Sequence, residues 1–100
     1  MADDGSEDGE LAAIKARCAL NLVVASQPKF ARNPLVIAAV ETAKASEAAL
    51  DAAVAKADAA PWFLLYGAHC HVREVCAELD RAHAALRAAL ASADAEAKAA

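Results

Sequence analysis

The chain has 100 residues and a net charge of −4, which is enough for one small domain. Five acids precede the first base and the remainder is nearly neutral, so no basic face arises that would bind nucleic acid. About a third of the residues are alanine, whereas Leu, Ile, Val and Phe together make up about a fifth. Composition therefore predicts a strongly helical chain with few large core side chains, which gains from sharing a core with a partner.

The cysteine pattern and the apolar runs indicate the cellular compartment in which we expect the protein. Three cysteines without paired spacing argue against a secreted disulfide framework and favour the cytoplasm or the nucleus. The first residues are acidic where a signal peptide is basic. The strongest apolar run, residues 19–25, is interrupted by Asn21 and is far shorter than the ~20 residues of a membrane span. We therefore expect an intracellular protein with no membrane partner.

Residues 1–9 are predicted to be a disordered acidic leader, and residues 10–26 a first helix. The inward stripe expected for this helix is Leu11, Ile14, Cys18 and Leu22. Three further apolar residues, Leu20, Val23 and Val24, widen the apolar surface beyond one stripe. The helix is therefore either packed on two sides or leaves a patch for a partner.

Residues 27–34 form the clearest break, because they hold Pro28 and Pro34. Phe30 within this break is expected to fold back over a helix end; the alternative is a contact loop between two basic residues. Asn33 and Pro34 then cap a second helix over residues 34–59. The core-facing stripe of that helix is mostly alanine, which predicts close approach of a neighbouring helix.

Pro61 marks the boundary to the last helix, predicted over residues 61–95 and followed by a frayed tail at 96–100. The aromatic-rich residues that come directly after the proline are expected to form a hydrophobic plug where the second and third helices turn back on each other. They are Trp62, Phe63, Leu64, Leu65 and Tyr66.

The last helix carries a heptad seam whose gaps alternate between four and three residues, the rhythm of a coiled coil. The seam residues are Leu65, His69, Val72, Cys76, Leu79, His83, Leu86 and Leu90. Because this helix is about ten residues longer than the second, we expect an overhang that leaves Leu86 and Leu90 uncovered within the chain. The charged flank beside the seam, Arg73, Asp80 and Arg87, is expected to set the register of a partner.

The histidines and cysteines raise a second hypothesis, metal or haem binding through His69, His71, Cys76 and His83. Within one helix their spacing is poor for chelation, so no cofactor or metal is predicted and a shared site between chains stays the alternative. The simpler interpretation is that seam histidines fix register, and that a buried neutral imidazole makes stability fall at acid pH. Cys70 is the only candidate for a catalytic nucleophile, and it lacks an activating base, so no enzyme is predicted.

Taken together, the sequence predicts an all-α protein: a three-helix antiparallel (up-down-up) bundle with a long, coiled-coil-like C-terminal helix, its domain covering residues 10–95. The predicted function is a non-enzymatic protein–protein interaction module, either an assembly or adaptor subunit or a self-associating scaffold. The predicted interface consists of Val72, Cys76, Leu79, His83, Leu86, Leu90, Arg73, Asp80 and Arg87.

Overall fold

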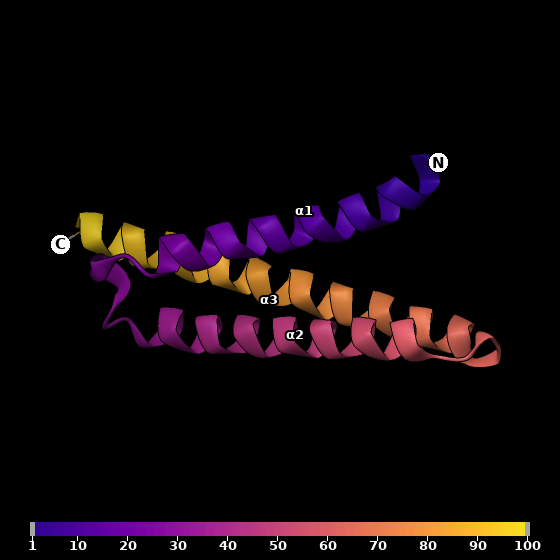
Figure 1. The fold of residues 1–100 in the computed structure, drawn as a ribbon. Helices are drawn as coiled ribbons and strands as arrows, with labels where there is room; N and C mark the ends of the chain where they lie inside the picture. The colour runs from indigo at the N-terminus through magenta and orange to yellow at the C-terminus, as the bar shows by residue number, and fades with distance from the viewer. Residues whose placement is uncertain (1, 100) are drawn as a thin grey trace.

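A computed structural model describes the backbone of residues 2–99 and the side chains of residues 11–99. Within the described backbone there are three α-helices, two short 3₁₀ turns and no strand. In chain order these are α1 (Ala2–Ala25), η1 (Pro28–Phe30), α2 (Pro34–Ala59), η2 (Trp62–Leu64) and α3 (Leu65–Ala99). The all-α class and the long last helix are confirmed. Figure 1 shows α2 and α3 side by side, with α1 lying along α3, in a rod 57 Å long and 25 Å wide.

Local signals set both ends of α2. The side-chain oxygen of Asn33 accepts hydrogen bonds from the backbone N–H groups two and three residues ahead, at 3.0 and 3.2 Å. Pro34 fits the first helical position, where no N–H is needed. At the other end Ala60 is extended, the conformation that a following proline favours. The observed range, Pro34–Ala59, coincides with the range expected from the sequence.

The two outer helices extend further than expected. α1 begins at Ala2 rather than at residue 10, and α3 continues to Ala99 rather than ending near residue 95. Continuing α3 through its alanine-rich end costs little, because alanine has the highest helix propensity. Residues 1 and 100 lie outside the described residues. Disorder of the leader and fraying of the tail stay predictions.

The core consists of two buried clusters that follow one another along the rod. One contains Ala25, Phe30, Val36, Ala43, Ala82, Leu86, Leu90 and Ala93. The other contains Ile14, Cys18, Leu50, Ala53, Val75 and Leu79. Half of the residues that α2 gives to the two clusters are alanines, so its backbone can approach α3 closely, as predicted.

The connection between α1 and α2 closes one end of the rod. Phe30 is 2% exposed and lies in the cluster with Leu86 and Leu90, so the prediction that it folds back over a helix end is confirmed. Lys29 beside it forms an ion pair with Asp94 of α3 at 2.9 Å. An exposed pair of this kind adds at most about 1 kcal/mol. Burial of the phenylalanine ring is therefore the main attachment of this connection.

The prediction that Leu86 and Leu90 lie in an uncovered overhang of α3 is wrong. Leu86 is 0% exposed and Leu90 is 7% exposed, both covered within the chain. Residues pair according to their distance from the turn between α2 and α3, so the start of α2 at Val36 reaches Leu90. The expectation from the sequence rested only on the lengths of α2 and α3. It therefore placed the residues of α3 that have no facing residue on α2 one to two helical turns too close to the start of α3. The part of α3 beyond Asp94 is what extends past α2.

Candidate functional site

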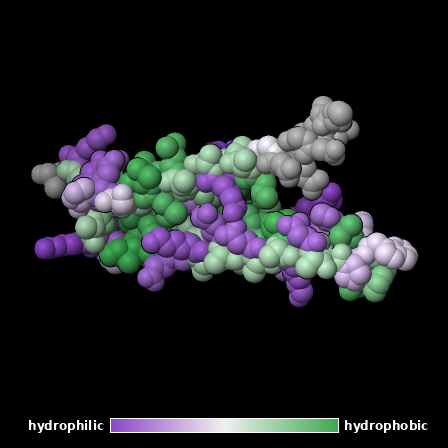
Figure 2. Space-filling view, in the orientation of Figure 1, coloured by the Kyte–Doolittle hydropathy of each residue, from purple (hydrophilic) through white to green (hydrophobic). Residues whose placement is uncertain are grey.

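The largest exposed apolar side chains in the described part of the chain lie at the turn between α2 and α3. Trp62 is 85% exposed, Phe63 65%, Leu64 55% and Tyr66 83%. We call these four residues the aromatic tip. The rings of Trp62 and Phe63 touch edge to face, with centroids 5.8 Å apart. In Figure 2 this turn forms the right-hand end of the molecule, where green atoms lie beside pale ones.

The prediction that these residues plug the space between the helices is wrong. At this end of α2 the buried residues are alanines, Ala53 and Ala57, which bring the two helix backbones close together. Helices that approach through alanine side chains leave no room between them for aromatic rings. Because Pro61 ends α2 and η2 leads directly into α3, the rings project outward from a short turn. Only Leu65 of the five expected plug residues is half-buried.

A second set of exposed apolar residues lies at the opposite end of the rod. Leu20 is 66% exposed, Val23 65% and Leu35 64%, and Val24 and Ile37 are exposed to a smaller extent. These residues come from the end of α1 and the start of α2, which meet at the left-hand end in Figure 1. Of the two outcomes expected for the wide apolar surface of α1, the structure shows a patch left open to solvent.

The heptad seam of α3 is closed at one end and open at the other. Its C-terminal half, Leu79, His83, Leu86 and Leu90, is buried within the chain. Its N-terminal half grades from half-buried at Cys76 and Val72 to exposed at His69. The flanking Arg73, Asp80 and Arg87 are exposed. The open end of the seam therefore adjoins the aromatic tip, at the end of α3 opposite to the predicted overhang.

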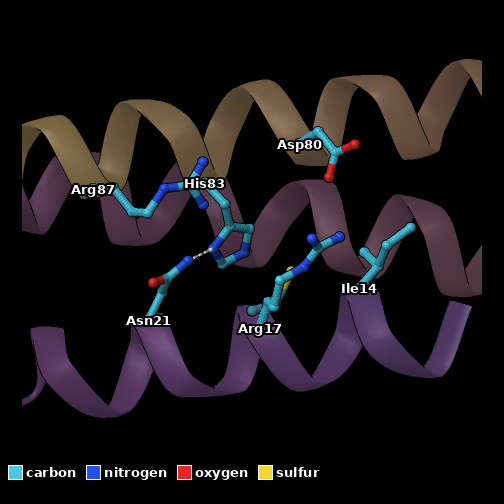
Figure 3. Close-up of a pocket in the computed structure, with 7 residues that line it drawn as sticks. Ile14, Arg17, Asn21, Asp80, His83 and Arg87 are labelled. Atoms are coloured by element: carbon cyan, nitrogen blue, oxygen red, sulfur yellow. Dashed lines mark hydrogen bonds between the residues drawn. The ribbon is translucent and has the colours of Figure 1, made fainter. Parts of the chain in front are cut away.

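His83 occupies a polar pocket between α1 and α3. Its imidazole points from α3 toward α1, where Asn21 Nδ2 lies 3.3 Å from His83 Nδ1 (Figure 3). Since an amide N–H donates, Nδ1 accepts, and the proton of the neutral ring lies on Nε2. That Nε2 is shielded from solvent and, among the described residues, has no hydrogen-bond partner.

The surroundings of His83 oppose its protonation. The adjoining cavity, of about 180 Å³, is lined by Ile14, Arg17, Cys18, Asn21, Asp80, His83 and Arg87. Burial is the main cause that lowers the pKa of His83, and Arg87 lowers it further, while Glu47 and Asp80 act in the opposite direction. Burial likewise raises the pKa of the Cys18 thiol. The raised pKa favours the protonated thiol of Cys18, and the lowered pKa favours the neutral imidazole of His83.

These positions do not form a metal site within one chain, and a site shared between chains stays a prediction. His69 and His71 are exposed, Cys76 is half-buried and His83 is enclosed under α1, so the four candidates are spread along α3. Among the residues that the structure describes, no group of three or more His, Cys, Asp or Glu side chains lies in an arrangement that could hold a metal ion.

Comparisons with known proteins give no information on this site. No family model matches the chain, and no curated protein and no solved structure matches it significantly. Within the described residues, none of the helices combines the length and the apolar character that crossing a membrane requires. The aromatic tip was present in the sequence as an aromatic run after Pro61, but periodicity did not show which way the rings face.

Proposed function

We propose that this chain is a non-enzymatic protein–protein interaction module, an up-down-up helical bundle that contacts its partner through the aromatic tip. The observation that carries the proposal is the exposure of Trp62 and Tyr66, at 85% and 83%. Tryptophan and tyrosine are the residue types most enriched at the centres of protein interfaces, because one rigid ring gives a large contact area.

The energy available at this surface is considerable. Burying apolar surface contributes roughly 25 cal/mol per Å², and an exposed aromatic side chain presents roughly 150–250 Å². Leaving three such rings in water therefore forgoes several kcal/mol per molecule. The chain buries Phe30 at its other end, so it is able to enclose a ring where the local structure allows it. A partner surface that covers the tip gains the free energy of burying the apolar area that the turn leaves exposed.

The proposal moves the predicted contact from the buried to the open part of α3. Leu79, Leu86 and Leu90 form the chain's own core, so a partner reaches them only if α1 and the α1–α2 connection move away. The half-buried Val72 extends the accessible apolar surface from the tip along α3. The roles considered from the sequence, an assembly or adaptor subunit and a self-associating scaffold, all fit a contact at one end of a rod.

A site-specific crosslinking experiment tests this proposal. A benzophenone amino acid replaces Phe63 in one version of the chain and the exposed Ala48 of α2 in a matched control, and both are irradiated in living cells. The proposal predicts protein adducts of defined mass from position 63 and none from position 48. The adducts should disappear when Trp62→Ser and Tyr66→Ser are added. The same adducts from both positions, or none from either, would contradict the proposal.

A further inference from the structure

We infer that the partner of the aromatic tip is a second copy of this chain, so that two molecules associate end to end about a two-fold axis. This inference rests on the proposed function and names the partner of the same surface. Three properties of the tip carry it: its area, its charge and the glycine beside it.

The exposed area of the tip is close to what a specific dimer needs. From the exposed fractions of its four residues, each chain offers about 500–600 Å², taking roughly 150–250 Å² for a fully exposed aromatic side chain. Two copies facing each other bury about 1,000–1,200 Å², which reaches the lower end of the ~1,200–2,000 Å² of specific interfaces. The area therefore predicts a reversible dimer rather than a permanent one.

The charges around the tip are compatible with self-association. Between residues 55 and 72 the only Lys, Arg, Asp or Glu residues are Lys56 and Asp58, so this segment carries no formal net charge. The tip segment itself therefore brings no excess of like charge into a contact between two copies. A two-fold arrangement brings the same patch of both copies together. Such an arrangement allows Lys56 of one copy to lie beside Asp58 of the other. A single lysine gives little attraction to an anionic lipid surface, which favours a protein over a membrane.

A glycine without a role inside the chain lies next to the tip. Gly67 follows Tyr66 in the first turn of α3, and a Cβ placed on it would meet no atom within 4 Å. Glycine costs a helix up to about 1 kcal/mol relative to alanine, and no contact within the chain requires it at this position. The missing side chain leaves the backbone beside Tyr66 open to close approach by another molecule.

The experiment follows the purified chain from micromolar to millimolar concentration with two readings. Light scattering gives the mass, and the fluorescence of Trp62, the single tryptophan of the chain, reports whether the tip is covered. We expect the mass to double and the emission to shift to shorter wavelength over the same concentration range. Doubling without a shift in emission would overturn the inference, because the tip would then lie outside the contact.

Two substitutions of equally exposed side chains locate the contact. Phe63→Ser removes a ring from the tip, whereas Leu20→Ser alters a residue of matched exposure, 66% against 65%, on α1. Phe63→Ser should raise the dissociation constant of the dimer at least about tenfold, the scale of truncating an interface aromatic, and Leu20→Ser should leave it unchanged. Gly67→Ala should keep the helix and weaken the dimer. Loss of the dimer with Leu20→Ser alone would overturn the inference.

The outcomes separate this inference from the proposed function. A chain that stays a single molecule at millimolar concentration overturns the second copy as partner, while adducts to a different protein at position 63 would still support the interaction module. A blue shift of Trp62 on adding neutral phosphatidylcholine vesicles, with no change in mass without them, would overturn both in favour of a membrane contact.

Discussion

The two ends of the α2–α3 pair differ in how they treat their aromatic side chains. At the end where α1 joins α2, Phe30, Leu86 and Leu90 are enclosed by three segments of the chain. At the other end, Trp62 and Tyr66 stand in water beside two helices whose contact is made by alanines. In this chain an aromatic ring is enclosed where a third segment covers the two helices. Where only two helices meet, large rings are left for a partner.

The largest effect is expected at the closed end. Leu86→Ala removes a side chain that is 0% exposed and leaves a cavity, which should lower the free energy of unfolding by about 2–5 kcal/mol. Urea denaturation followed by circular dichroism measures the change. A loss below about 1 kcal/mol would mean that Leu86 is open to solvent, as the overhang expected from the sequence required.

A smaller loss is expected from the cap of α2. Asn33→Ala removes the oxygen that accepts hydrogen bonds from two backbone amides, and should destabilise the protein by about 1 kcal/mol. Asn33→Asp keeps an acceptor at the same place and serves as the control, since it should retain most of the stability. If both variants lose the same amount, the cap does not stabilise α2 in the way described.

The pocket of His83 predicts a loss of stability on acidification. Because burial lowers the pKa of His83 in the folded protein, the unfolded chain, with a histidine pKa of about 6.5, binds the proton more tightly. The free energy of unfolding is therefore at its full value above about pH 6.5. It decreases progressively as the pH falls toward the lowered pKa of His83 in the folded protein. The charged side chains around the site are Arg17 of α1, Glu47 of α2, and Asp80 and Arg87 of α3.

Thermal unfolding between pH 8 and pH 5 measures this dependence, and His83→Leu provides the comparison. Leucine has a similar volume and does not titrate, so the variant should lose less stability than the parent between about pH 6.5 and pH 5. Equal slopes for the two proteins would show that other groups cause the acid sensitivity. The exposed His69 is the matched position for a control, and His69→Leu should keep the slope of the parent.

At the open end the expected effect on stability is the smallest. Tyr66→Ser changes a side chain that is 83% exposed, and the free energy of unfolding of the single molecule should stay within about 0.5 kcal/mol of the parent. Dilute protein and chemical denaturation give this value. A loss of about 2 kcal/mol or more would place the ring in the chain's own core and remove the contrast between the two ends.

Much of the fold could be predicted from local signals. Asn33 with Pro34 and the position of Pro61 defined α2, and the apolar spacing of α1 identified Ile14 and Cys18 as inward-facing. Periodicity also placed Leu79 and Leu86 on one face of α3. These features depend on neighbours within a few turns of the same helix, which is why the sequence alone reveals them.

The candidate site was harder to predict because it depends on how segments distant in sequence meet. The C-terminal half of the predicted seam is buried, whereas His69 is exposed and Val75, outside the seam, is buried. Which half α1 covers follows from the distance of each residue from the turn. The rings after Pro61 face solvent because the facing residues of α2 are small, and a run of aromatic residues carries no information on that gap. The contact between His83 and Asn21 likewise requires the register of α1 against α3.

Quenching of Trp62 fluorescence by acrylamide in dilute protein tests the central claim most directly, since this is the chain's single tryptophan. The account predicts emission at long wavelength and a quenching constant in the folded protein close to that of the chain unfolded in urea. Blue-shifted emission with weak quenching in the dilute, folded protein would contradict it, because the tip would then be packed inside its own chain.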